Sequence, residues 1–420
     1  MRRCAALVLG FVGLVAVGLP AWSGTASATG APVIVVIDST GFDTSNPALA
    51  GHVVDEVCLD ALGGQSWEQS FCPGHGTAVS GAGVAMPQVT NGAFTFSGEF
   101  HGTAVASEVL NVDPTAQLIV IRALYSFTTA LSWVAQHAAN YDIAAVVYSM
   151  SGPLNDPSLR GWVPCDQSTE TVGAQNITTK PFIDALAQLN VPVVIAAGND
   201  GNAQYLSVPA CISSAVSVAA SDGSSIASYS NVSTQVSIVA PGTATVATEN
   251  EPGQFGTASQ IGTSFAAPYV GAIFAIARAQ YPTMPYTEVL AAMRASGARL
   301  NDQDVSGLPV ASPAATMAML AAGTTPTLAS TFTTQVSISG SPTSGSGAAS
   351  QQLADALTHI TALETQVTQL QAQVTALTAS VAQGVANATL ARNLTARVRA
   401  LLGTITVLRR ELASDRRRLG

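Results

Sequence analysis

Charged residues are scarce in this chain: Asp, Glu, Lys and Arg together make up only 10% of its 420 residues. Basic residues are the scarcer kind, since residues 29–321 hold 6 Lys and Arg against 21 Asp and Glu. A body this acidic lacks the basic surface with which proteins bind phosphate backbones. We therefore expect no nucleic acid among its partners.

An apolar run occurs near the N-terminus, but it is short for a helix that crosses a membrane. It extends from Ala5 to Leu19, follows Arg2 and Arg3, and precedes an Ala-x-Ala cleavage signal at 26–28. Residues 1–28 therefore predict a cleaved signal peptide and an extracellular protein with no transmembrane anchor.

Cysteine is also rare, and the spacing of the cysteines matches no zinc-site pattern, so we expect no metal centre built on them. Cys4 lies within the predicted signal peptide. The four others form an even number in an exported chain, which predicts two disulfide bonds. Three pairings of these four are open, and the lengths of the closed loops favour Cys58–Cys72 and Cys165–Cys211.

From residue 33 onward, short apolar runs alternate with helix-like stretches. Runs rich in β-branched residues without polar alternation are typical of strands buried on both faces of a parallel sheet. We therefore expect residues 29–322 to form one α/β domain with a doubly wound parallel sheet. The expected strands are 33–37, 118–121, 143–148, 191–196 and 235–239, and the expected helices are 102–110, 128–139, 181–189, 264–278 and 286–295.

The C-terminal part of the chain differs in composition. Residues 323–350 carry no charge and are rich in Ser, Thr, Gly and Pro, which predicts a flexible linker. Residues 351–420 contain a heptad seam from Leu363 to Val381, which predicts a helical coiled coil and self-association. A hairpin with its break near Gly384, or a helix that packs on the α/β domain, fits the pattern as well.

Three motifs carry the chemistry, in the order Asp, His, Ser. The first strand ends at Asp38, and the pentapeptide His-Gly-Thr-Ala-Val occurs twice, beginning at His75 and at His101. Ser264 lies in the block Gly-Thr-Ser-Phe-Ala-Ala-Pro at 262–268. These blocks resemble those of the subtilisin-like serine peptidases, over about residues 32–320. The resemblance implies that Ser264 is the nucleophile and that Asp38 orients the catalytic histidine.

The two histidine motifs differ in the segments that come after them. His101 is succeeded by a helix-like stretch, a short turn and the apolar run at 118–121, as in the family's histidine block. His75 is succeeded by a glycine-rich segment with no expected strand, in a region that resembles a cysteine-bearing loop of some secreted members. We therefore predict that His101, and not His75, faces Asp38 and Ser264.

The resemblance assigns further roles. Asn199 follows a buried strand and a Gly, and it is expected to donate its side-chain amide to the oxyanion of the reaction. Substrate is expected to lie as an added strand along Met150, Ser151 and Gly152, where the sequence departs from the family's usual Ser-Leu-Gly-Gly. The Val208–Pro209 peptide bond is expected to be cis, as in the family's corresponding turn.

The sequence thus predicts a secreted serine endopeptidase that acts on polypeptides. Calcium is often bound in this family, but no acidic cluster assigns a site here, so we expect no cofactor that the sequence can locate. The alternative function is a catalytically weak or retired peptidase fold that acts as a binding or assembly protein through the coiled coil.

The expected helix at 264–278 places Pro268 in its first turn, where the missing N–H costs little.

Overall fold

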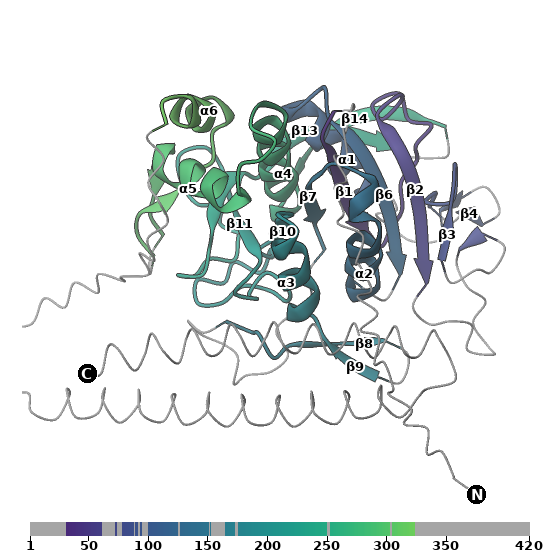
Figure 1. The fold of residues 1–420 in the computed structure, drawn as a ribbon, viewed down its shortest axis with the longest axis horizontal. Helices are drawn as coiled ribbons and strands as arrows, with labels where there is room; N and C mark the ends of the chain where they lie inside the picture. The colour runs from purple at the N-terminus through teal and green to yellow at the C-terminus, as the bar shows by residue number, and fades with distance from the viewer. Residues whose placement is uncertain are drawn as a thin grey trace, which may run out of the picture. The chain divides into compact units, whose positions relative to one another are not determined.

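The computed structural model describes part of the chain (Figure 1). The chain divides into two compact units, Met1–Thr331 and Phe332–Gly420, and all described residues lie in the first. The predicted signal peptide, residues 324–350 of the linker and the predicted coiled coil lie outside the described residues. The described ranges are 31–60, 72–73, 78–87, 89–90, 93–94, 100–124, 127–150, 152, 164–172, 175–249, 253–302 and 305–323.

The centre of the fold is an eight-stranded sheet with the strand order β12-β11-β10-β7-β1-β6-β2-β3. Its strands are parallel except for the edge strand β3, which pairs antiparallel with β2. The bounds are β1 (Val33–Asp38), β2 (Val53–Asp60), β3 (Ala78–Ser80), β6 (Gln117–Leu124), β7 (Ile143–Tyr148), β10 (Val193–Ala196), β11 (Val216–Ser221) and β12 (Ile238–Pro241).

Helices cover both faces of this sheet (Figure 1). Ile34 and Val36 of β1 belong to the core that α1 and α4 complete, whereas Val35 and Ile37 belong to the core of α2 and α3. Burial on both faces explains why these strands are continuously apolar. The helices are α1 (His101–Val112), α2 (Phe127–His137), α3 (Lys180–Gln188), α4 (Thr263–Gln280), α5 (Tyr286–Ser296) and α6 (Pro313–Ala321), with a 3₁₀ turn η2 at Ala138–Asn140.

In the described part of the chain, four small antiparallel pairs lie outside the main sheet. The longest is β13–β14, whose second strand leads directly into Gly262 and α4. The pairs are β4 (Val89–Thr90) with β5 (Ala93–Phe94), β8 (Thr169–Val172) with β9 (Gln175–Thr178), β13 (Thr243–Glu249) with β14 (Phe255–Ile261), and β15 (Arg299–Leu300) with β16 (Leu308–Pro309).

The strand order reverses direction at β1. The chain places β6 on one side of β1 and then crosses over through α2 to place β7 on the other side. In open α/β sheets, the crevice at the carboxyl ends of the strands beside such a switch point is where ligands bind. Asp38 is the last residue of β1, and Ser149 follows β7 at this same edge.

The expected fold class and five helices are present, but three details were wrong. The last expected strand begins at Ile238 and not at 235, because Ser233 and Ser217 hydroxyls bind the N–H groups of Gln235 and Ser237 and hold that segment in a turn. A short strand, β3, occurs after His75, because Ala78–Ser80 pairs with the edge of β2. Helix α4 begins at Thr263, so Pro268 lies in its second turn.

Candidate active site

The side chains of Asp38 and His101 meet at the carboxyl edge of the sheet. Asp38 ends β1 and is fully buried, and His101 is the first residue of α1. The imidazole Nδ1 lies 2.7 Å from Asp38 Oδ2, while the imidazole itself keeps 25% of its surface exposed. An Nδ1–H that donates to this carboxylate leaves Nε2 free to accept a proton.

Thr40 connects the turn after β1 to the first turn of α1. Its N–H and its hydroxyl both donate to Asp38 Oδ1 at 2.8 Å, and its Oγ1 accepts from the N–H of Gly102 at 3.1 Å. A Cβ on Gly102 would lie 2.3 Å from the carbonyl oxygen of Gly41. Glycine after the histidine is therefore needed, because it lets the helix approach the aspartate turn closely enough for the Asp38–His101 bond.

Asp38 and His101 shift each other's pKa in the direction that favours the ionised forms, carboxylate and imidazolium. Burial alone raises the pKa of the Asp38 carboxyl, but the charge and hydrogen bond of His101 and the donors of Thr40 outweigh it, so this pKa is below its ordinary value. Burial alone lowers the pKa of His101, but the carboxylate of Asp38 outweighs it, so the imidazole pKa is raised. Asp38 therefore stabilises the imidazolium that forms when His101 takes a proton.

Of the two histidine motifs, the structure brings the one at His101 to Asp38. His75 lies outside the described residues. The ring of His101 also lies 6.2 Å from the ring of Phe265, centroid to centroid, and Phe265 follows Ser264 directly. Asp38, His101 and Ser264 are thus neighbours at the carboxyl edge of the sheet.

Ser264 lies in the first turn of α4, the longest described helix, where the positive end of the helix dipole faces the site. Its side chain is largely buried, with 8% of the residue exposed. The hydroxyl donates to the carbonyl oxygen of Ser149 at 3.0 Å. Among the described residues, no hydrogen bond joins Ser264 to His101, so the hydroxyl must turn away from Ser149 to reach the imidazole.

Asn199 follows β10 and is exposed. Its Oδ1 accepts two hydrogen bonds from Thr263, one from the N–H and one from the hydroxyl, both at 2.9 Å. These two donors fix which way the amide points. The amide nitrogen Nδ2 can only donate, so the atom that accepts from the Thr263 N–H must be Oδ1. Nδ2 lies beside Gly262, where an added Cβ would be 3.5 Å from it and 3.8 Å from Ser264 Cβ. Gly262 thus lies next to both the amide donor and the proposed nucleophile.

The expected substrate strand is described in part. Met150 is half-buried, and Ser151 lies outside the described residues. Gly152 pairs antiparallel with Val208 through two backbone hydrogen bonds of 2.9 and 3.2 Å. The Val208–Pro209 bond that comes next is cis, as predicted.

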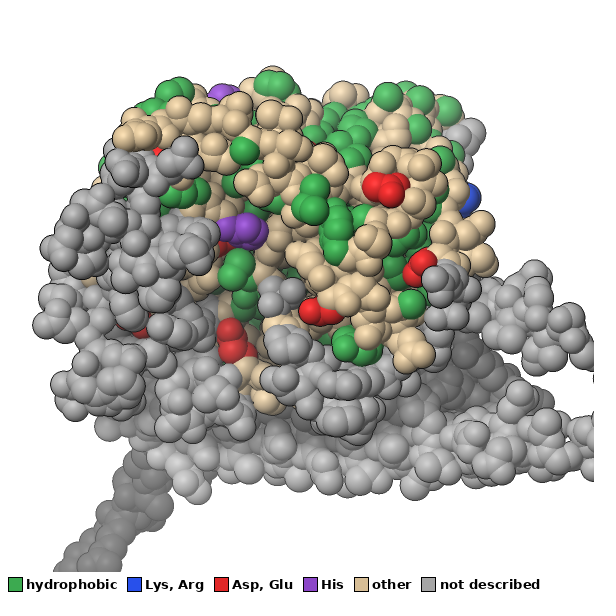
Figure 2. Space-filling model, turned by 180° about the vertical axis from the view of Figure 1, so that it is seen from behind, with side chains coloured by type: hydrophobic (Ala, Val, Ile, Leu, Met, Phe, Trp, Pro, Cys, Tyr) green, Lys and Arg blue, Asp and Glu red, His purple; other side chains and the backbone are tan. Residues whose placement is uncertain are grey.

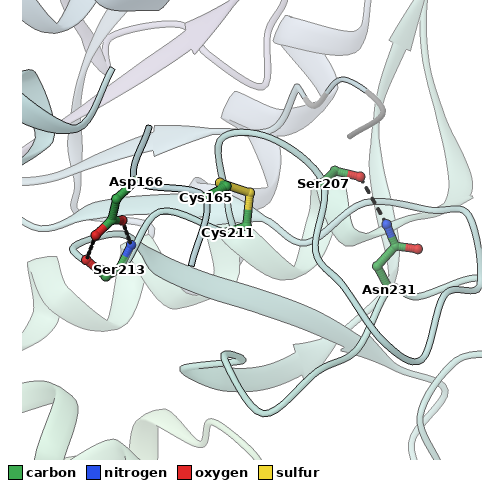
Figure 3. The surroundings of a disulfide bond; sticks show 6 residues. All are labelled: Cys165, Asp166, Ser207, Cys211, Ser213 and Asn231. Atoms are coloured by element: carbon green, nitrogen blue, oxygen red, sulfur yellow. Dashed lines mark hydrogen bonds between the residues drawn. A yellow bond between two sulfur atoms is a disulfide. The ribbon is translucent and has the colours of Figure 1, made fainter. Parts of the chain in front are cut away.

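Both predicted disulfides are present. Cys58–Cys72 closes the loop after β2, and Cys165–Cys211 ties the segment after Val208 to the start of the described stretch 164–172 (Figure 3). Beside the second disulfide, Asp166 accepts hydrogen bonds of 2.8 Å from the N–H and the hydroxyl of Ser213.

The described residues carry few charged side chains, and most of these are acidic. On the face in Figure 2, acidic side chains are scattered among uncharged ones and basic side chains are scarce. Within the described ranges, no three His, Cys, Asp or Glu side chains are grouped as metal ligands would be. No helix in this part of the chain is long and apolar enough to cross a membrane.

Sequence reasoning did not anticipate the roles of Thr40, Ser149 and Thr263. Each of these hydroxyls binds a group of the predicted triad or of Asn199, and Thr263 lies within the serine motif at 262–268. Thr40 binds Asp38 two residues before it, so its position beside that residue was an available signal. The partners of Ser149 and Thr263 lie 115 and 64 positions away, so no local pattern pointed to those two bonds.

A buried carboxylate bonded to an imidazole, a serine at a helix start and a side-chain amide are the types of group that serine hydrolases with a Ser-His-Asp triad use. Comparison with protein families identifies the type. The model of the Subtilase family of peptidases matches residues 30–308, so the chain belongs to this family.

Relatives within the family are distant. The chain is 27% identical over 292 residues to an extracellular protease of Xanthomonas campestris pv. campestris, covering 63% of this chain and 46% of that protein. It is 26% identical to subtilisin DY of Bacillus licheniformis, over 65% of this chain and 86% of that one. The chain thus spans about half the length of the Xanthomonas relative.

Among solved structures, a protease from Pseudoalteromonas arctica has the same fold. It superposes with a TM-score of 0.54 at 19% identity, covering 69% of this chain and 90% of the other. This likeness supports the α/β architecture described above.

Proposed function

We propose that this protein is an exported serine endopeptidase in which Asp38, His101 and Ser264 form the catalytic triad. Ser264 attacks the carbonyl carbon of the scissile peptide bond, and His101 Nε2 takes the hydroxyl proton. The same imidazolium then protonates the leaving amine, and a water repeats the sequence to release the acyl group. Asp38 orients the imidazole and stabilises its charged form.

Asn199 provides the side-chain donor of the oxyanion hole. The two Thr263 donors occupy its Oδ1 and leave its Nδ2, beside Gly262, available as a donor, which supports this role. Such a donor is already in place before charge develops on the carbonyl oxygen, so its stabilising effect falls on the transition state. The N–H of Ser264 at the start of α4 is the second donor.

The proposed substrate is an extended polypeptide that adds as a strand beside Met150, Ser151 and Gly152. Pairing of Gly152 with Val208 supports this arrangement, because it holds Gly152 in a bridge of the kind that an extended strand makes. The family as a whole consists of peptidases, so a polypeptide is the substrate class that the comparisons favour.

The proposal has three further parts. Residues 1–28 direct export, the mature protein is extracellular, and residues 351–420 associate with those of other copies of the chain. The extracellular relative in Xanthomonas supports the location. The prediction for cofactors is unchanged: none is assigned, and calcium is possible but has no site that the sequence can locate. Residues 351–420 do not take part in catalysis in this account.

The observation that carries the proposal is the 2.7 Å bond between His101 and Asp38 at the sheet edge that also holds Ser264. The test is hydrolysis of an unstructured protein such as casein, with the cut bonds located by mass spectrometry. The purified chain should cut internal bonds, and Ser264→Ala should not. Binding of the polypeptide without cleavage by either form would instead support the retired peptidase fold.

A further inference from the structure

Asn231 is a fully buried polar residue in the loop between β11 and β12. Its side-chain amide makes four hydrogen bonds, all to the segment that follows Asn199. Oδ1 accepts from the N–H groups of Asp200 and Asn202, each at 3.0 Å. Nδ2 donates to Asp200 Oδ2 at 3.1 Å and to Ser207 Oγ at 3.0 Å. Both donors and both acceptor positions of the amide are therefore used.

Gly198, the residue before Asn199, lies directly against this amide. Its φ is +107°, and a Cβ at this position would lie 2.4 Å from Asn231 Nδ2 and 2.1 Å from Ser207 Oγ. The N–H of Asn231 donates to the Gly198 carbonyl oxygen at 2.9 Å. Glycine is needed here for both the backbone conformation and the close approach. The turn that carries Asn199 is thus held from both of its sides by one residue.

The network also reaches the strand that receives substrate. Ser207, to which Asn231 donates, precedes Val208, and the backbone of Val208 pairs with Gly152. Figure 3 shows the Ser207–Asn231 bond in the same region as the Cys165–Cys211 disulfide. The buried side-chain amide of Asn231 therefore fixes the Asn199 turn relative to the Val208 segment, which pairs with the proposed substrate strand at Gly152.

We propose that Asn231 is a positioning residue for the oxyanion donor, because its side chain sets the place of the Asn199 turn relative to the Val208 segment. This proposal rests on the proposed function, since it assigns Asn231 an effect only through Asn199. A displacement of a catalytic donor by about an ångström is enough to lose much of its effect on the rate.

The chemistry of the site requires an amide. An Asp at 231 would place a second carboxylate beside Asp200, where Nδ2 now donates. A Leu would remove the acceptor of the N–H groups of Asp200 and Asn202 and would lose two hydrogen bonds in this partly buried turn, which destabilises it. Neither side chain offers what the amide of Asn231 offers, which is two N–H donors and an oxygen that accepts two hydrogen bonds.

The test is a double-mutant cycle on the full chain, with kcat and KM measured on a chromogenic peptide. Asn231→Ala in the wild-type background should lower kcat by roughly tenfold or more. In an Asn199→Ala background the same substitution should change kcat by less than about twofold, because the donor that it positions is already absent. An equal loss of kcat in both backgrounds would overturn the proposal.

Two further variants keep the test decisive. Ser207→Ala removes one of the four bonds and leaves the amide in place, so it applies even if Asn231→Ala fails to fold. It should give a smaller loss of kcat that also disappears in the Asn199→Ala background. Asn190→Ala is the matched control, since that side chain bonds Met284 O and Tyr286 N away from the site. It should lower the melting temperature and leave kcat unchanged, and a loss of kcat there would count against a specific role for Asn231.

The outcome for Asn199→Ala alone separates this proposal from the proposed function. If that single substitution leaves kcat unchanged, the oxyanion role of Asn199 is wrong, and the proposal for Asn231 fails with it. If Asn199→Ala is strongly impaired but Asn231→Ala and Ser207→Ala are not, the proposed function stands and only the positioning role is refuted.

Discussion

Ser264 and Ser149 exchange hydrogen bonds: the hydroxyl of each donates to the carbonyl oxygen of the other, at 3.0 Å from Ser264 and 2.8 Å from Ser149. The bond to the Ser264 carbonyl has a local cause. In a regular helix this carbonyl would accept from the N–H of residue 268, but Pro268 has none. The Ser149 hydroxyl takes the place of the missing donor and thereby ties the nucleophile's backbone to the end of β7.

Ser149→Ala tests this tie. The substitution leaves the Ser264 carbonyl oxygen buried without its donor, which should destabilise the fold by about 1–3 kcal/mol. Because the nucleophile's backbone is then less firmly placed, kcat should also fall, by roughly tenfold. The control is Ser217→Ala, which removes the hydroxyl of another buried serine, in β11. It should cost similar stability at unchanged kcat, and equal kcat values for both variants would refute the role of Ser149.

The pH dependence of kcat/KM should report His101. The general base must be neutral, so activity falls as the pH drops through the imidazole pKa, which Asp38 raises above its ordinary value of 6.5. Asp38→Asn removes the cause of that rise, so the acid limb of the profile should move to lower pH. Its kcat should fall by about 10⁴-fold, the loss known for the same change in a serine protease of another fold.

Asp113→Asn is the control for this profile. Asp113 is also buried, but its carboxylate binds Thr115 in the turn after α1 and does not touch His101. The acid limb should keep its position in this variant. An unchanged acid limb in Asp38→Asn would show that another group determines it.

The two disulfides should differ in what their removal does. Loop-closure estimates give about 3 kcal/mol for the 14-residue separation of Cys58–Cys72 and about 4 kcal/mol for the 46-residue separation of Cys165–Cys211. Replacing either pair by Ala should lower the melting temperature. Only loss of Cys165–Cys211 should raise KM, because Cys211 follows the Val208 segment that pairs with Gly152. A raised KM for the Cys58–Cys72 variant instead would contradict this assignment.

Truncation after Gly323 should leave turnover of a small peptide unchanged, because residues 351–420 do not contribute to catalysis in this account. Light scattering should show the mass of a monomer for the truncated chain and a larger assembly for the full chain. If the full chain is already monomeric, the helices pair within one chain, as in the hairpin with its break near Gly384. Loss of peptide turnover on truncation would make the tail part of the catalytic unit.

Strands β1 and β7 were predictable because they are buried on both faces, whereas β11 (Val216–Ser221) is equally buried and was not predicted, because Ser and Ala interrupt its β-branched residues. Val33–Asp38 and Ile143–Tyr148 are nearly pure runs of apolar residues, and no competing pattern fits them. Strand β2 was not predicted, because Val53–Asp60 contains three acidic residues and one half of it is only partly buried. The hairpin β13–β14 was missed for a similar reason, since its second strand is almost wholly exposed and rich in Gly, Thr, Ser and Gln.

In the candidate site, the motif residues could be named from the sequence and their supports could not. Asp38, His101 and Ser264 each stand in a recognisable block. Ser149 and Asn231 act through bonds to residues 115 and 24–31 positions away in the chain. Only the folded sheet brings these partners together, so no local pattern encodes them.

The most direct test of the triad is active-site labelling with a fluorophosphonate, followed by peptide mapping. We expect one labelled peptide, which carries the label on Ser264. We also expect that His101→Ala slows the labelling by orders of magnitude, while His52→Ala, at a histidine that bonds Ala116 O away from the site, labels at the wild-type rate. Label on another serine, or undiminished labelling of Ser264 in His101→Ala, would contradict the proposed triad.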